Sequence, residues 1–352
     1  MMHAPSYASL DDALEILAPY GIALRNGNSN HAPMVAEALC AMGRPDAVMP
    51  WIARYCERML PKPEAGARIS RQDWRAVLGD RSRFADWSEF FDEELRETSW
   101  REVLDRWVDH LVPGFSGAAT HGVIRVGHAA RSLALGQTPQ RLRELADAFA
   151  SWAATYQELP AGGPTANGPM RPRDAIARVP IVPPDRRNYA GNIMAALAML
   201  EDLPEFASAI RLIDTSGELA PLVSELTELF TRVYLANAHD IRTTIAFIHG
   251  VTSPAALGNI ASQIGDRTAR AALPYAWQAG CGLYACFGGD TAVAEDIEPC
   301  HQEEDELVDR AITHGDEHVI KFTEACLHRN ALSPTPVYLA AVDHVSGMIP
   351  RR

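Results

Sequence analysis

Apolar residues recur along this chain at intervals of three and four, the spacing of one face of an α-helix. Alanine, leucine, arginine and glutamate carry most of these segments, and no set of alternating valine, isoleucine and threonine runs suggests a central sheet. With 352 residues, of which 47% are hydrophobic, the chain is long enough to bury a sizeable core. The sequence therefore predicts an all-α fold, a single large multi-helix domain over residues 1–352.

A stretch rich in proline and glycine, from Leu159 to Asn188, interrupts the helical pattern. We interpret 159–188 as an extended connection or a lid rather than a packed helix. It is not interpreted as a domain boundary, because candidate functional residues lie on both sides of it. The predicted helices are 9–18, 31–42, 45–60, 71–79, 98–111, 117–134, 139–157, 190–201, 205–213, 217–237, 240–249, 254–263, 267–286, 303–314 and 317–330.

Charge and motif content argue against several classes of protein. The net charge is −13 and no lysine and arginine run forms a basic patch, so neither nucleic acid nor a membrane surface is an expected partner. No signal peptide, transit peptide or apolar run of about 20 residues is evident. The six cysteines have no CxxC spacing, so we expect reduced thiols and a cytoplasmic location. A flavin or NAD(P) cofactor has no support, because no GxGxxG fingerprint follows a strand.

Histidines lie on the apolar faces of four separate predicted helical segments. The segments are those of His31, of His121 with Arg125 and His128 at offsets of four and seven, of His249, and of His318 with His314 and Lys321. Four such histidines are what a helical scaffold would supply to a metal held in its core. Scattered buried and surface histidines are the alternative, and the residues alone leave both interpretations open.

The segment "HGDEHVIKF", residues 314–322, contains one of only two lysines in the chain, Lys321. If one helix ran from Leu307 to His328, His318 and Lys321 would share its apolar face. Gly315 leaves a second possibility open, in which one helix ends there and Asp316 caps the next.

Two other functions remain open. The dipeptide His239–Asp240 is the pair that HD-type phosphohydrolases use to bind metal, so a metal-dependent phosphohydrolase is one alternative. A non-catalytic helical binder of aromatic ligands is the other, and it rests on the apolar core and its aromatic and methionine content.

Four blocks resemble the questin oxidase-like family, in that family's order: "NSNHAPMVAEALCAMG", "PGFSGAATHGVIRVGHA", "TIAFIHGVTSPAAL" and "AITHGDEHVIKFTEAC". The resemblance implies a non-haem Fe(II)-dependent oxygenase with O₂ as co-substrate. Its substrate would be a polycyclic aromatic, such as an anthraquinone or hydroquinone, changed by oxygen insertion or ring cleavage. The resemblance also implies metal ligands at His31, His121, His249, His318 and a carboxylated Lys321.

The chemistry of lysine is consistent with that implied role. An ammonium has no lone pair for a metal, but a desolvated neutral amine can react with carbon dioxide to give an anionic carbamate, which arginine cannot do. For the catalytic residues, we expect His128 to shuttle a proton or contact the substrate and Arg125 to hold a phenolate, while segment 159–188 covers the pocket. A structural hydrogen bond or ion pair is an equal alternative for His128 and Arg125.

Overall fold

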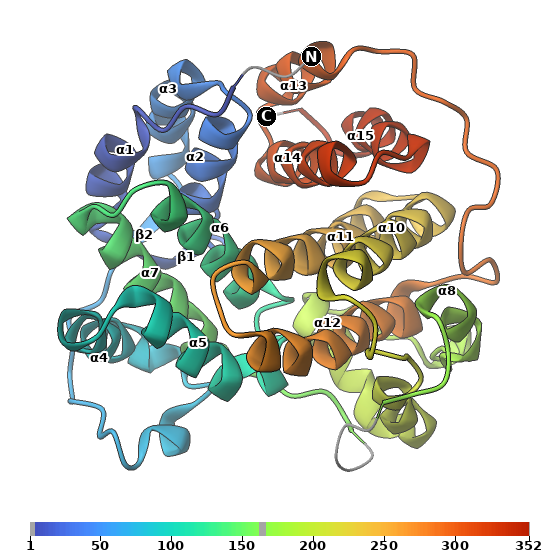
Figure 1. The fold of residues 1–352 in the computed structure, drawn as a ribbon, viewed down its shortest axis with the longest axis horizontal. Helices are drawn as coiled ribbons and strands as arrows, with labels where there is room; N and C mark the ends of the chain where they lie inside the picture. The colour runs from blue at the N-terminus through green and yellow to red at the C-terminus, as the bar shows by residue number, and fades with distance from the viewer. Residues whose placement is uncertain (1–3, 162–166, 352) are drawn as a thin grey trace.

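The computed structural model describes residues 4–161 and 167–351, and helices dominate it (Figure 1). The α-helices are α1 Leu10–Leu17, α2 Ala32–Ala41, α3 Pro45–Cys56, α4 Phe84–Glu97, α5 Trp100–Leu111, α6 His121–Leu135, α7 Pro139–Ala154, α8 Pro172–Ala175, α9 Ile193–Leu197, α10 Leu219–Asn237, α11 Ile241–Ala261, α12 Asp266–Phe287, α13 Glu304–His314, α14 Glu317–Leu332 and α15 Pro336–Met348. The 3-10 helices are η1 Trp74–Val77, η2 Arg81–Arg83, η3 Val112–Gly114, η4 Ile176–Arg178, η5 Pro184–Arg186, η6 Ala198–Asp202 and η7 Pro204–Arg211. Strands β1 Tyr20–Leu24 and β2 Met59–Pro61 form one small antiparallel pair. The all-α prediction is confirmed.

Side-chain caps start several helices where the sequence offers a polar residue. Ser99 accepts a hydrogen bond from the backbone N–H of Glu102 at the start of α5, and Thr138 does the same for Arg141 at the start of α7. These caps satisfy N–H groups that have no partner within the first turn of the helix. Local sequence thus determines where these helices begin.

Packing between the helices builds one continuous core. In Figure 1, α1 to α7 occupy one side of the molecule and α10 to α15 the other, and α6 packs against α11 where the two sides meet. Four helices form a closed ring of neighbours there, because α2 contacts α6, α6 contacts α11, α11 contacts α14, and α14 contacts α2. Each of the four helical segments with a predicted histidine ligand supplies one helix of this ring.

Several boundaries differ from the prediction. The two helices expected at 240–249 and 254–263 are one helix, α11, with Pro254 in its interior. A proline removes only one helical N–H donor and kinks the backbone locally, and packing of α11 against α6, α10, α12 and α14 holds the helix together across it. The predicted separation of 303–314 from 317–330 is confirmed, because α13 and α14 are separate helices. Gly315 ends α13 with φ of 80°, and Asp316 caps α14 by accepting from the His318 N–H.

Other elements were missed or misassigned. Helices α4 and α15 were not predicted, the segment at 59–61 is a strand rather than the end of a helix, and 71–79 and 205–213 contain 3-10 rather than α-helix. Tertiary packing decides these cases, since aromatic side chains of α4 are buried against α7.

The proline-rich segment is mainly irregular where it is described, and residues 162–166 lie outside the described part. Its later half is held against α12, because the Val182 N–H donates to the Ala285 carbonyl at 2.8 Å and the Arg187 guanidinium donates to the Gly288 carbonyl at 2.7 Å. All six cysteines are free thiols. Among the described helices, none combines the length and apolar character that crossing a membrane requires.

Candidate metal centre

The structure brings the four predicted histidine ligands together at the ring of α2, α6, α11 and α14. His31 immediately precedes α2, His121 begins α6, His249 lies in the middle of α11, and His318 is in the first turn of α14. All four are buried, with exposed fractions of 3%, 9%, 1% and 8% respectively. Three helix N-termini therefore converge on the cluster, and their partial positive charge favours an anion beside it.

The imidazole rings are in direct contact with one another. The ring centroids of His31 and His121 are 4.6 Å apart, those of His121 and His249 are 4.6 Å apart, and those of His31 and His318 are 4.7 Å apart. The Nε2 atoms of His31 and His121 are separated by 2.6 Å, and those of His249 and His121 by 3.3 Å. Nitrogen lone pairs at these distances repel each other unless a proton or a cation lies between them.

Backbone and side-chain acceptors determine which nitrogen of three rings carries the proton. Nδ1 of His121 lies against the Ala118 carbonyl, Nδ1 of His249 is 2.7 Å from the Ile245 carbonyl, and Nδ1 of His318 is 3.1 Å from Asp316 Oδ1. Each Nδ1–H can donate to its acceptor, which leaves the lone pair on Nε2. This arrangement is the usual support of a metal-binding histidine.

A left-handed backbone turn precedes α6 and positions His121. Ala118, Ala119 and Thr120 have φ of 48°, 56° and 70°, a region that costs a non-glycine residue about 1–2 kcal/mol. The turn directs the Ala118 carbonyl toward His121 Nδ1. Gly122 then lets α6 approach α7 closely, since an added Cβ would lie 2.6 Å from Trp152. The strain is located at the cluster, as is common at functional sites.

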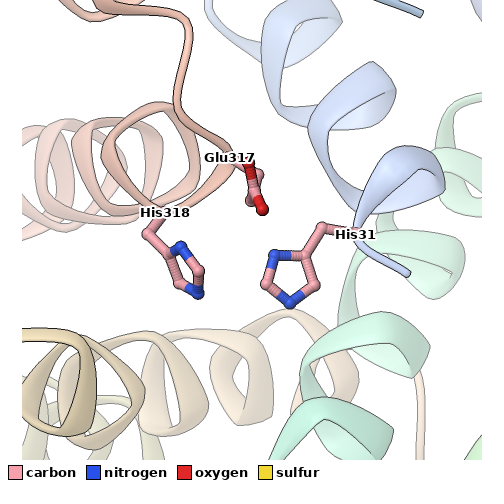
Figure 2. Close-up of side chains that lie close together, drawn as sticks. All are labelled: His31, Glu317 and His318. Carbon is pink, nitrogen blue, oxygen red and sulfur yellow. The ribbon is translucent and has the colours of Figure 1, made fainter. Parts of the chain in front are cut away.

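Glu317 is the residue of this centre that the sequence interpretation missed. One ligand atom each from His31, Glu317 and His318 lie within 4.8 Å of one another, and Figure 2 shows the carboxylate between the two rings. The Arg58 guanidinium donates to both Glu317 oxygens, at 3.3 and 3.4 Å. The sequence did offer a signal, since Glu317 directly precedes His318 in a predicted helix. A divalent cation held by histidines needs an anion nearby to balance its charge, and a glutamate at this position can supply one.

Burial lowers the pKa values of three of the clustered imidazoles, those of His31, His121 and His249, and so favours their neutral form. Desolvation is the main reason that the pKa of His121 falls to about 3, and the nearby Lys321 charge lowers it further. Desolvation likewise lowers the pKa values of His31 and His249, with Lys321 and the neighbouring histidines adding to the effect. Neutral imidazole is the form that binds a metal.

Lys321 lies one turn beyond His318 on α14 and is 2% exposed. Its ammonium is 4.0 Å from Met34 Sδ and forms no ion pair with any residue in the described ranges. Burial lowers the pKa of Lys321 to about 8, an effect that Glu317 and Asp316 partly oppose. A buried amine with this pKa is partly deprotonated near neutral pH, which is the condition for reaction with carbon dioxide.

The donor set fits a first-row divalent metal. The 4.8 Å limit on the His31, Glu317 and His318 ligand atoms is close to the roughly 4.2 Å between opposite ligands on a metal with bonds of about 2.1 Å. His31 Nδ1 is buried and has no hydrogen-bond partner among the described residues, and Figure 2 shows this side of the ring facing Glu317 and His318. Imidazoles with a carboxylate suit Fe(II), and also Mn, Co, Ni or Zn.

The other predicted residues lie outside this cluster. Arg125 forms a buried bidentate ion pair with Glu144, with distances of 2.6 and 2.8 Å. His128 Nδ1 is 2.6 Å from Glu37 Oε2. Both residues thus make contacts of the kind that the structural alternative describes. A substrate-binding role for Arg125 would require its ion pair with Glu144 to open. His314 is the last residue of α13, before Gly315, and its Nε2 is 2.8 Å from the Ile349 carbonyl.

The dipeptide of the phosphohydrolase alternative is also elsewhere. His239 and Asp240 are exposed, and Asp240 caps α11 by accepting from the Thr243 N–H at 2.8 Å. Among the described residues, the buried group with metal-ligand spacing contains neither of them. This geometry gives the phosphohydrolase hypothesis no support.

A cavity of about 270 Å³ leads to the cluster, and all four histidines line it. The size is near the lower end of small-molecule sites. Residues 189–196, which follow the proline-rich segment, form part of its wall. None of the described residues of 159–188 lines the cavity, and residues 162–166 lie outside the described part, so the lid role of that segment stays a prediction.

The model of the family described as Questin oxidase-like matches residues 29–326, a range that contains the four histidines, Glu317 and Lys321. No curated protein matches the chain significantly.

Proposed function

Because this chain belongs to the questin oxidase-like family, we propose that it is a non-haem iron-dependent oxygenase of a polycyclic aromatic substrate. The observation that carries the proposal is the convergence of four buried histidines on one cavity, with three of their Nδ1 atoms held by acceptors. The family supports oxidative chemistry on an anthraquinone-like or hydroquinone-like compound, by oxygen insertion or ring cleavage.

In this proposal His31, His121, His249 and His318 hold Fe(II), and Glu317 supplies an anionic oxygen beside His31 and His318. Lys321 becomes a carbamate, which extends the side chain by a carboxylate and adds a second anionic ligand. Iron bound there supplies the one-electron chemistry that lets dioxygen react with a closed-shell aromatic.

The chain's own residues bind and orient the reactants. The Ala118, Ile245 and Asp316 acceptors fix the imidazoles, so the ligands need little rearrangement when metal binds. The apolar wall formed by Ile193 and Met194 excludes water from one side of the cavity and suits a planar aromatic.

Metal analysis of matched variants tests the proposal. His318→Ala removes a proposed ligand, whereas His239→Ala changes the exposed histidine of the alternative site. After anaerobic incubation with Fe(II), wild type and His239→Ala should retain stoichiometric iron and consume O₂ with hydroxylated anthraquinones or hydroquinones, and His318→Ala should lose both properties. Loss of metal in His239→Ala with retention in His318→Ala would refute the assignment.

The carbamate has its own test. Wild-type protein depleted of carbon dioxide should regain iron affinity when bicarbonate is added, and ¹³C-bicarbonate should give a carbamate resonance that Lys321→Arg lacks. Unchanged iron affinity in Lys321→Arg would remove Lys321 from the ligand set without affecting the four histidines.

A further inference from the structure

The mouth of the histidine cavity carries two arginines that the site described so far does not use. Arg81 and Arg242 both line the cavity and are exposed, whereas the histidines at its other end are buried. Neither arginine forms an ion pair within residues 4–161 and 167–351. In a protein with a net charge of −13, this entrance has a local excess of positive charge.

Arg242 is positioned by an aromatic stack. Its guanidinium lies 4.8 Å from the centroid of the Tyr189 ring, which stacks on Phe287 at 5.2 Å and 14°. The Tyr189 hydroxyl donates to the Cys286 carbonyl at 2.9 Å, which fixes the ring. A guanidinium held by its face in this way keeps its N–H donors at the edge available for a planar anion.

Arg81 is far from Arg242 in the sequence, in η2, yet it lines the same cavity. Glu317 is the carboxylate that lines this cavity, and it is occupied by Arg58. Among the described residues, no carboxylate forms an ion pair with either arginine at the mouth, although Asp240 lies close enough to Arg242 for their charges to interact.

Much of the remaining wall is apolar. Ala118 and Ala119 line one part, and Ile193, Met194 and Phe287 line others. The cavity thus combines an apolar space for aromatic rings with cationic donors at the entrance and metal-binding groups at the inner end.

We infer that the ligand of this cavity is an aromatic carboxylate, with its carboxylate bound by Arg81 and Arg242 at the mouth and its ring directed toward the histidines. This inference rests on the proposed function, because it names the substrate class of the same site. Guanidinium groups match the geometry of a carboxylate and bind it through paired hydrogen bonds. The phenolate-binding role of Arg125 stays a separate prediction.

Equilibrium binding without turnover tests the inference. Anaerobic titration of the zinc-loaded protein would compare anthraquinone-2-carboxylate with its neutral carboxamide in wild type, in Arg81→Gln/Arg242→Gln, and in Arg178→Gln/Arg211→Gln. Arg178 and Arg211 are exposed and do not line this cavity, so the control changes the net charge equally. Wild type and control should prefer the carboxylate by about tenfold, and added salt should weaken the preference. The Arg81 and Arg242 double variant should bind both compounds with the affinity of the carboxamide.

The inference would be overturned by equal affinity for the two compounds in wild type, or by a carboxylate preference that persists in the double variant. Failure of both compounds to bind would overturn it as well. None of these results depends on iron content or O₂ consumption, so they are distinguishable from failure of the oxygenase proposal. A carboxylate preference in a protein that consumes no O₂ would support the inference and reject the oxygenase function.

Discussion

Replacement of Lys321 by methionine should stabilise the metal-free protein, although it removes a residue of the proposed site. The Lys321 ammonium is buried without an ion pair in the described structure, and desolvation lowers its pKa from 10.5 to about 8. At about 1.36 kcal/mol per pH unit, this difference corresponds to roughly 3 kcal/mol by which the folded state disfavours the charge. Methionine has a similar length and no charge, so its packing cost should be below about 1.5 kcal/mol.

The pH dependence separates the charge effect from packing. Below pH 8, Lys321 is protonated in both the folded and the unfolded protein, and the full penalty is present. Between pH 8 and 10.5 the unfolded chain binds more protons than the folded one, so the stability of wild type rises with pH. The advantage of Lys321→Met should therefore be largest near pH 7 and decline toward pH 10.5, while any packing term stays constant.

The assay is urea unfolding of chelator-treated protein, free of carbon dioxide, followed by circular dichroism across this pH range. Lys62→Met is the matched control, because Lys62 pairs with Asp147 at 2.6 Å and its loss leaves that carboxylate buried and unpaired. Lys62→Met should destabilise the protein at pH 7. A Lys321→Met effect that is destabilising at pH 7, or a difference that does not change with pH, would refute the reasoning.

Three further predictions concern residues around the centre. Arg125→Met should destabilise the protein by about 3–5 kcal/mol because it leaves Glu144 buried without its partner. The double variant Arg125→Met/Glu144→Leu should recover most of this loss. A double variant that folds but loses affinity for a phenolic ligand would instead support the predicted phenolate role of Arg125. Burial alone would raise the pKa of Glu37, but Arg131 and hydrogen bonds hold this pKa well below its usual range. The stability that the Glu37 carboxylate contributes is therefore present at neutral pH and is lost as the pH falls below about 4.5. Glu37→Gln should flatten the acid limb of a plot of melting temperature against pH. Ala119→Val should lower stability by about 1–2 kcal/mol and weaken iron binding, whereas Ala119→Gly should preserve both properties. The reason is that Ala119 has a positive φ, which only glycine adopts freely. Equal melting temperatures for the two variants would contradict the strain argument.

Periodicity was sufficient for the helical class and for placing histidines on apolar faces, and the family resemblance indicated which of those histidines would meet. Each histidine could be located because the period of an apolar face is a local property of a single helix. The boundaries were less predictable. Pro254 indicated an interruption that does not occur, since the neighbours of α11 hold the helix together, whereas the break that Gly315 indicated between 303–314 and 317–330 is present.

The side-chain partners were not predictable in the same way. Arg125 and His128 share a face with His121 in the sequence pattern, yet the structure pairs them with Glu144 and Glu37. Glu317 was missed because consecutive residues inside a helix point to different sides, so a neighbour of His318 is not expected at the same site. Glu317 instead lies at the very start of α14, where Arg58 holds its carboxylate.

What the sequence alone determined is the chemistry available: four histidines on apolar faces, a rare lysine beside one of them, and a predominantly helical scaffold. What only the tertiary structure decided is which groups meet, which histidine nitrogens face inward, and where unpaired positive charge remains. The reason is physical. Periodicity and capping act within one helix, but His31 and His121 are 90 positions apart, and their 2.6 Å contact depends on how α2 and α6 pack within the closed ring.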